Sequence, residues 1–242
     1  MIQMIRSFLH IVQMYIALPI ISLAYFPYAI FSPAGAHAAC HAYSRWVIWT
    51  LTWMVGLKIE IRGTPPTDEV MVAAKHQSFL DVMTIYNAMP RGKFIMKRIL
   101  MYAPFVGQYG LRVGCVPVDR GKRGAAIKKM LEDVRQGKQQ GGQLIIYPQG
   151  TRIAPGVAAP YKKGTGALYA QMGQPCVPVA TNIGLFWPKK GITRKPGVAV
   201  VEFLPRIAPG LEPRQFMEQL EHDIETASNA LLDEAGFKRD VS

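Results

Sequence analysis

A histidine and an aspartate that lie close together in the chain, His76 and Asp81, have the residue types of an acid–base pair. They stand where an apolar run gives way to a helical pattern, in the segment Ala-Ala-Lys-His-Gln-Ser-Phe-Leu-Asp. On one continuous helix this spacing would place the two side chains on different faces. They can meet if His76 lies in a loop and Asp81 in the first turns of the helix that follows. The carboxylate would then orient the imidazole, which would act as a general base toward an alcohol.

A second interpretation of the same aspartate needs no catalysis. Ser78 and Asp81 have the spacing of a capping box, in which a serine and an acidic residue satisfy the free N–H groups at the start of a helix. The His76 segment by itself therefore leaves both interpretations open.

Three further blocks follow in order along the chain. They are Gly-Cys-Val-Pro-Val-Asp-Arg ending at Arg120, Tyr-Pro-Gln-Gly-Thr-Arg ending at Arg152, and Val-Pro-Val-Ala ending at Ala180. Together with the His76 block, this ordered set resembles the glycerolipid acyltransferase family, and within it the bacterial 1-acyl-sn-glycerol-3-phosphate acyltransferases. That family has an N-H-x4-D block, a block ending in D-R, an F-P-E-G-T-R block and a V-P-[IV] block. The resemblance covers residues 58–205.

The resemblance implies a role for each matching residue. It implies that His76 removes the proton from the free hydroxyl of a lysophospholipid, which attacks an acyl thioester, while Asp81 orients the imidazole. The positions that match the phosphate-binding residues of the family are Arg120, Gly150, Thr151 and Arg152. Their chemistry agrees, because guanidinium groups bind phosphate bidentately and a turn after a strand can aim backbone N–H groups at an anion. For Arg120, a surface ion pair with Asp119 is the competing interpretation.

Two lysines and two departures from the family pattern complete the candidate site. Lys162 and Lys163 precede a predicted helix and would add positive potential for a substrate phosphate, although a solvated charged turn is the alternative. Lys75 stands where the family usually has asparagine, which predicts altered support around His76. Gln149 stands where the family usually has glutamate, so it can hydrogen-bond an acceptor hydroxyl but carries no charge.

The elements that must hold these residues follow an α/β pattern after residue 57, with short apolar runs alternating with helical stretches. The strands are predicted at 58–62, 70–75, 93–96, 115–118, 143–147, 176–181 and 198–204. The clearest helices are predicted at 79–89, 122–138, 164–172 and 214–234. With the family resemblance, this pattern predicts a mixed, mostly parallel sheet flanked by helices, of the glycerol-3-phosphate acyltransferase type, in one domain over residues 58–242.

Residues 1–57 are predicted to form membrane-anchoring helices, since Arg6 and Arg45 are the only charged residues among them. The stretch 7–31 is long enough to cross a bilayer, but Pro19 and Pro27 equally allow a bent helix inserted at the surface. A second apolar run at 46–57 is rich in tryptophan, which suits a headgroup interface. We expect two helices joined by residues 32–45. A cleaved signal peptide is the competing interpretation, because small residues at 34–39 resemble a cleavage site.

Charge and composition narrow the function. The chain of 242 residues has 28 Lys and Arg against 16 Asp and Glu, a net charge of +12, which indicates an anionic partner. No phosphate-binding nucleotide loop is found, and no aromatic–basic pattern indicates nucleic-acid binding. Three widely separated cysteines give no disulfide or zinc pattern and suit a reducing cytoplasm. We therefore expect no metal, no cofactor and no nucleic-acid partner.

These observations predict a membrane-associated acyltransferase that forms phosphatidate from lysophosphatidate. The donor is expected to be acyl-CoA or acyl carrier protein, and the basic surface is expected to bind anionic membrane lipid. The expected location is the inner membrane of a bacterium, with the catalytic domain on the cytoplasmic side. One alternative is an acyltransferase for another lysolipid, and the other is a non-catalytic membrane-binding scaffold.

Overall fold

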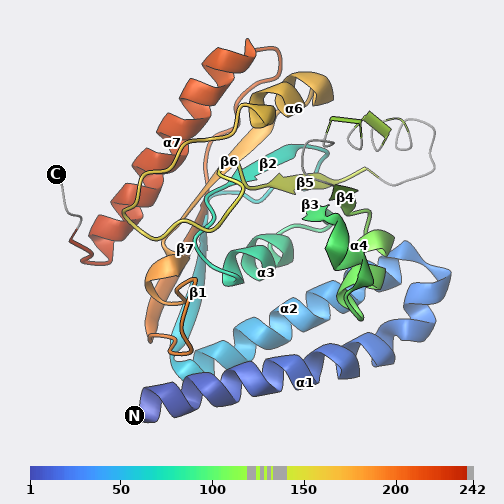
Figure 1. Cartoon of the computed structure of the whole chain (residues 1–242), viewed down its shortest axis with the longest axis vertical. Helices are drawn as coiled ribbons and strands as arrows, with labels where there is room; N and C mark the ends of the chain where they lie inside the picture. The colour runs from blue at the N-terminus through green and yellow to red at the C-terminus, as the bar shows by residue number, and fades with distance from the viewer. Residues whose placement is uncertain (119–123, 126–127, 130–131, 133–140, 239–242) are drawn as a thin grey trace.

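A seven-stranded β-sheet runs through the centre of the protein (Figure 1). The computed structural model describes residues 1–118, 124–125, 128–129, 132 and 141–238. The strands are β1 (Leu57–Arg62), β2 (Met71–Ala74), β3 (Gly92–Lys97), β4 (Val116–Val118), β5 (Gln143–Ile146), β6 (Cys176–Thr181) and β7 (Gly197–Phe203). Their order in the sheet is β1-β7-β6-β2-β5-β3-β4. Neighbouring strands are parallel except β6 and β7, which are antiparallel. The predicted mixed, mostly parallel sheet is thus confirmed.

The central strand β2 contributes side chains to two separate cores. Val72 and Ala74 pack into the core on one face of the sheet, whereas Met71 and Ala73 pack into the core on the other. Both sets are almost completely buried. This burial on both faces explains why β2 is a continuous apolar run rather than an alternation of apolar and polar residues.

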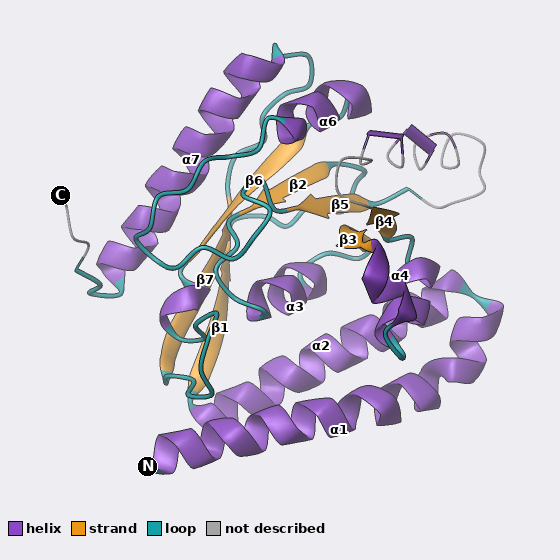
Figure 2. Cartoon of the chain, in the orientation of Figure 1, coloured by secondary structure: helices purple, strands orange, loops and turns teal. Residues whose placement is uncertain are grey.

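Helices cover both faces of the sheet (Figure 2). On one face lie α2 (Pro33–Val55) and α3 (Leu80–Asn87), and on the other lie α6 (Gly164–Met172) and α7 (Pro213–Glu234). Shorter elements are η1 (Arg98–Tyr102), α4 (Val106–Arg112) and η2 (Ile183–Leu185). The apolar stripe predicted on α7 is confirmed, since Phe216, Leu220 and Ile224 are fully buried against the sheet. The helix predicted at 122–138 lies for the most part outside the described residues.

The N-terminal segment forms a helical hairpin of α1 (Ile2–Phe31) and α2, and the predicted linker at 32–45 is wrong. Only Ser32 separates the two helices. Its side chain accepts a hydrogen bond from the N–H of Ala34 (3.2 Å), and Pro33 occupies the first helical position, so the sequence begins a new helix at once. The small residues that resemble a cleavage site therefore lie inside α2.

Close packing at the tip of the hairpin explains these small residues. A Cβ atom on Gly35 would lie 2.5 Å from the carbonyl carbon of Tyr28 in α1. Ala36 and Ala39 are also buried at this contact. Two helices this close together need small side chains at their contact. This need accounts for the small residues at 34–39, which also resemble a cleavage site.

Among the described residues, α1 is the one helix long and apolar enough to cross a membrane. It continues as a helix through Pro19 and Pro27. One face of α1 packs on α2, and many large apolar side chains on the rest of its surface are exposed, including Phe8, Ile16 and Leu23. On α2, Val47, Leu51 and Val55 pack into the same core as β2 and α3. The hairpin is thus packed directly against the sheet domain that begins at residue 57.

Replacing Gly35 with alanine tests the close helix contact. The added methyl group would clash with the backbone of α1, and we expect a loss of about 1–3 kcal/mol in the free energy of unfolding. Thermal unfolding in detergent measures this loss as a midpoint lowered by several degrees. Gly164→Ala is the control, because a Cβ at this first residue of α6 meets nothing within 4 Å. Equal midpoints for Gly35→Ala and the wild type would contradict the packing argument.

Candidate active site

The carboxyl ends of β2 and β5 bring two of the sequence blocks together. The two strands are neighbours and parallel, with Val72 beside Ile145, so the loops that follow them meet at the same edge of the sheet. We call residues 75–79 after β2 the His76 loop, and residues 147–153 after β5 the Arg152 turn. The strand β4 ends at this edge as well, but Asp119 and Arg120, which follow it, lie outside the described residues.

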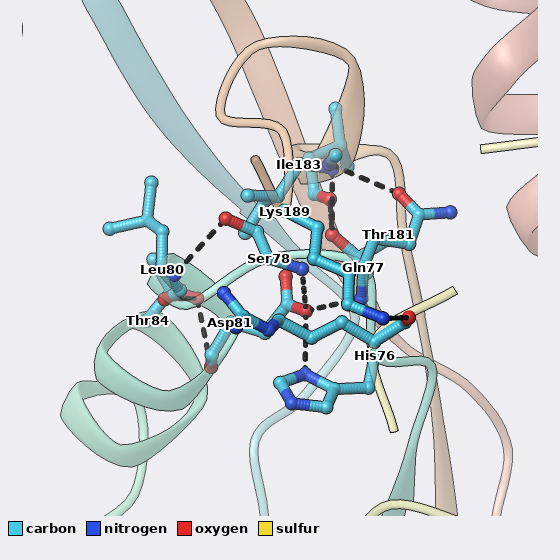
Figure 3. Close-up of polar contacts among 12 residues, drawn as sticks. His76, Gln77, Ser78, Leu80, Asp81, Thr84, Thr181, Ile183 and Lys189 are labelled. Atoms are coloured by element: carbon cyan, nitrogen blue, oxygen red, sulfur yellow. Dashed lines mark hydrogen bonds and ion pairs between the residues drawn. The ribbon is translucent and has the colours of Figure 1, made fainter. Parts of the chain in front are cut away.

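His76 and Asp81 form a hydrogen-bonded pair, as the sequence predicts (Figure 3). His76 lies in the loop and Asp81 in the first turn of α3, and Nδ1 of the imidazole is 3.1 Å from Oδ2 of the carboxylate. The His76 side chain is 16% exposed, whereas Asp81 is fully buried. Because an ionised carboxylate can only accept, Nδ1 carries the proton of the neutral imidazole and Nε2 is left free as a base.

The same carboxylate also organises the start of α3. Oδ2 of Asp81 accepts hydrogen bonds from the N–H groups of Gln77 (2.7 Å) and Ser78 (2.8 Å), and the hydroxyl of Ser78 accepts from the N–H of Leu80 (3.2 Å). The capping interactions and the His–Asp pair therefore exist together. In the described part of the chain, Oδ1 of Asp81 has no hydrogen-bond partner, so the hydrogen bonding of this carboxylate passes through one oxygen.

Tyr147 forms one wall of the site. Its ring stacks on the imidazole of His76, with centroids 3.9 Å apart and planes 19° from parallel. Burial raises the pKa of the Tyr147 phenol well above its usual value, and the charge of Asp81 adds to this shift. The phenol thus stays neutral and supplies an apolar face that limits rotation of the imidazole. Sequence reasoning assigned no role to Tyr147, although its place at the start of the block that ends at Arg152 was a usable signal.

Backbone and amide contacts connect the His76 loop to its neighbours. The N–H of Ile153 donates to the carbonyl oxygen of His76 (2.8 Å), and the N–H of Gly184 in η2 donates to Oε1 of Gln77 (3.1 Å). A side chain on Gly184 would meet Gln77 at 2.7 Å, so glycine is required for this approach. The first contact joins the Arg152 turn to the His76 loop, and the second joins η2 to the same loop.

The predicted phosphate-binding residues are partly assembled by the Arg152 turn. Gly150 has a positive φ of 69°, and a Cβ there would lie 2.5 Å from Nζ of Lys162, so the lysine lies directly over the glycine. Thr151 is exposed and Arg152 is partly exposed beside them. Lys163 is exposed at the start of α6. The structure thus brings Lys162 to Gly150.

Gln149 is buried, with 4% of its surface exposed. Its amide nitrogen Nε2 donates to the main-chain oxygen of Ala159 (3.3 Å). A glutamate carboxylate has no proton to donate to a carbonyl oxygen, so it could not make this contact in its ionised form. The departure from the family pattern therefore has a structural consequence in the loop of residues 154–163.

Lys189 is a further cation at this site that sequence reasoning missed. Its Nζ donates to the main-chain oxygen of Arg152 (3.0 Å), and its side chain lies beside the His76 loop (Figure 3). The only signal in the sequence was a basic run that contains Lys189 and Lys190. In the described ranges, no three His, Cys, Asp or Glu side chains come close enough together to hold a metal ion.

A partly exposed imidazole held by a buried carboxylate, at the carboxyl edge of an α/β sheet, is an arrangement suited to general-base catalysis. The Acyltransferase family model matches residues 58–182, more than half of the chain. The chain belongs to this acyltransferase family, as the ordered sequence blocks predict.

Curated relatives of the chain carry consistent names. It is 30% identical over 177 residues to a 1-acyl-sn-glycerol-3-phosphate acyltransferase of Pseudomonas aeruginosa, a match covering 72% of this chain and 69% of that protein. It is 32% identical over 158 residues to a protein of the same name from Limnanthes alba, covering 64% and 56%. It is 32% identical over 168 residues to the mouse 1-acyl-sn-glycerol-3-phosphate acyltransferase alpha, covering 66% and 59%. The last two matches span less than two thirds of those relatives.

A solved structure shares the fold. The crystal structure of the 1-acyl-sn-glycerophosphate (LPA) acyltransferase PlsC from Thermotoga maritima superposes with a TM-score of 0.77 at 20% identity. The superposition covers 94% of this chain and 97% of that one, so it includes most of the helical hairpin as well as the sheet domain.

Two substitutions separate the catalytic role of Asp81 from its role in capping. In Asp81→Asn the residue keeps an oxygen for the backbone N–H groups but loses the charge that stabilises an imidazolium. We expect acyl transfer from a thioester to fall by about 10²–10⁴ in kcat. Among the described residues, the asparagine amide nitrogen has no acceptor where Oδ1 lies, so we also expect a loss of about 1–3 kcal/mol of stability, and kcat is compared well below the thermal midpoint. Ser78→Ala removes only the cap and should cost about 1 kcal/mol of stability, with kcat within a few-fold of wild type. If Asp81→Asn stayed fully active, Asp81 would have only the capping role.

Proposed function

We propose that the protein transfers a fatty acyl group from acyl-CoA or acyl carrier protein to the free hydroxyl of 1-acyl-sn-glycerol-3-phosphate, and so forms phosphatidate. The observation that carries this proposal is the His76–Asp81 pair beside the Gly150–Arg152 segment at one edge of the sheet. A base and an anion-binding segment side by side suit an acceptor that has both a hydroxyl and a phosphate. The names of the curated relatives support the same acceptor.

The reaction begins with a proton transfer. Nε2 of His76 takes the proton of the acceptor hydroxyl as its oxygen attacks the thioester carbonyl, and Asp81 stabilises the imidazolium that forms. The tetrahedral intermediate then collapses, the C–S bond breaks, and the imidazolium returns the proton to the leaving thiolate. The products are phosphatidate and the free thiol of the donor, so His76 ends the cycle neutral. No residue of the protein is acylated in this sequence.

The acceptor phosphate is assigned to the Arg152 turn. The guanidinium of Arg152 can bind two phosphate oxygens, and Lys162 over Gly150 adds a second cation. The positive φ of Gly150 belongs to a tight turn that follows β5 and can present backbone N–H groups to an anion. Arg120, Thr151 and Lys163 are assigned to the same phosphate on the resemblance of the sequence blocks.

We assign the helical hairpin to the surface of the membrane and do not expect it to cross the bilayer. Along its inner face α1 makes polar contacts with the rest of the protein: Nε2 of Gln3 donates to the carbonyl oxygens of Val55 (3.1 Å) and Arg194 (2.8 Å), and His10 contacts that of Val47 (3.2 Å). The catalytic domain covers the opposite side of α2, so only the outer surface of the hairpin can face lipid. A helix lying in the interface plane has this one-sided exposure.

The proposed cellular location follows from the substrates and the thiols. The lysolipid and phosphatidate reside in the bilayer, and a net charge of +12 favours an anionic membrane surface. The three cysteines are free, which suits a reducing compartment. We therefore assign the protein to the cytoplasmic side of a bacterial inner membrane, where acyl-CoA and acyl carrier protein are found.

Labelling of Ser32→Cys tests how the hairpin meets the membrane. If the hairpin lies in the interface plane, Ser32 at its tip stays on the same side of the membrane as the catalytic domain. An impermeant maleimide added to that side of sealed vesicles should then label the introduced cysteine. The wild type is the labelling control for the native cysteines. Labelling from the opposite side alone would establish a span.

Washing of the membranes tests how the protein is held there. High salt should leave the protein bound, because burial of apolar surface is not screened, and detergent should release it.

Arg152→Ala tests the acceptor. Loss of a bidentate partner for a doubly charged phosphate removes hydrogen bonds of about 1.5–3 kcal/mol, so we expect kcat/KM for lysophosphatidate to fall roughly tenfold to a hundredfold. Use of an acceptor that lacks the phosphate monoester should change much less, and Arg152→Lys should recover only part of the loss. A wild-type preference for the acceptor without phosphate would favour another lysolipid. Absence of acyl transfer to every lysolipid would favour the scaffold interpretation.

A further inference from the structure

Lys75 is a buried charge immediately before His76, and the proposed reaction does not use it. Only 3% of its surface is exposed. Its Nζ lies 2.6 Å and 2.7 Å from the two carboxylate oxygens of Glu225 on α7, so the side chain leads to the opposite side of the sheet from α3. The residue that departs from the family pattern thus makes a bidentate ion pair with the helix behind the site.

Glu225 also holds a second segment of the active site. The hydroxyl of Tyr161, a residue only 8% exposed, donates to Oε1 of Glu225 (2.9 Å). The next residue, Lys162, donates its N–H to the carbonyl oxygen of Pro148 (3.0 Å) and lies over Gly150. One carboxylate therefore accepts hydrogen bonds from the residue before His76 and from the residue before Lys162.

We propose that Lys75, Glu225 and Tyr161 form a positioning network that fixes the distance between the base and the phosphate-binding turn. This inference rests on the proposed function. The hydroxyl and the phosphate of the acceptor are separated by a few covalent bonds, so their binding groups must keep a matching separation. An error of about 1 Å in such placement can cost on the order of a hundredfold in rate.

The environment of the network supports a positioning role. The pair joins a buried lysine to a carboxylate that is 28% exposed. Replacing a buried ion pair by apolar residues is often neutral for stability, and a partly exposed partner weakens the attraction further, so the pair is weak evidence for stabilisation alone. Burial, together with the charges of Glu225 and Glu221, holds the pKa of Tyr161 far above its usual value, and the phenol therefore remains a hydrogen-bond donor. The network links three segments that are remote in sequence without touching the reacting atoms.

Tyr161→Phe is the sharpest test, because it keeps the buried ring and removes only the hydroxyl. We expect kcat for lysophosphatidate to fall about tenfold, the equivalent of one charged hydrogen bond, with the KM of the acyl donor unchanged. A second variant, Lys75→Met with Glu225→Gln, removes both charges so that none is left buried and unpaired. It should lower kcat at least as much at temperatures well below its thermal midpoint.

The matched control is Glu218→Gln on the exposed side of α7. Glu218 pairs with Arg214 (2.9 Å), and its side chain is 65% exposed, so the same chemical change should leave kcat unaltered. Hydrogen exchange provides a readout that needs no acceptor: the amide of Lys162 should exchange faster in Tyr161→Phe, while amides in β2 and β6 keep their protection.

The possible outcomes are distinct. Wild-type kcat in both network variants, or unchanged exchange at Lys162, would overturn the positioning network. A parallel loss of kcat and of protection throughout the core would show a purely structural role and would overturn it as well. If the wild type fails to acylate lysophosphatidate, the proposed function fails, and the exchange of Lys162 still tests whether the network holds this loop.

Discussion

The burial of one carboxylate constrains the architecture of the active site. An ionised Asp81 without partners would cost several kcal/mol in the interior, so donors must surround it. Two of these donors are N–H groups of the His76 loop, and the third is the imidazole. The N–H groups point at Asp81 only because the chain turns between β2 and α3. The turn that satisfies the carboxylate is therefore also the turn that holds Nδ1 of His76 against Asp81 and leaves Nε2 free.

Local sequence patterns were sufficient to place the strands and the His–Asp pair, whereas the mixed, mostly parallel sheet was predicted with the help of the family resemblance. Most strands are short apolar runs bounded by polar or turn residues, β1 alternates apolar with charged residues, and all seven strands were placed close to their observed limits. His76 and Asp81 were predictable because a single loop and helix start bring them together. Partners that are distant in sequence leave no such pattern: Lys75 and Glu225 are 150 residues apart, and Tyr161 and Glu225 are 64 apart. Their meeting depends on how α7 packs across the sheet.

Polar residues within an apolar helix have a different meaning in a helix pair than in a lone helix, and α1 is an example. His10 and Gln13 interrupt the apolar stretch of α1. The nitrogen of the Gln13 amide donates to the hydroxyl of Thr50 (2.9 Å), and its oxygen accepts from the indole of Trp46 (2.7 Å). His10 is fully buried beside Val47. These residues mark the inner face of a helix pair. The tryptophans of α2, of which Trp49 and Trp53 are more than half exposed, mark the outer face. The pairing of α1 with α2 thus buries polar side chains of α1 and leaves large apolar side chains exposed on the outer side of the hairpin.

Gln149 affects both the charge and the geometry of the Arg152 turn. In the proposed reaction the acceptor brings a doubly charged phosphate to Arg152 and Lys162. A glutamate at 149, as the family usually has, would place a negative charge within the same turn, whereas glutamine adds none. The amide of Gln149 instead donates to Ala159, in the loop that leads to Tyr161 and Lys162. In the proposed reaction, Gln149 therefore contributes a neutral hydrogen-bonding group that ties the turn to this loop and leaves the balance of charge to the cations and the phosphate.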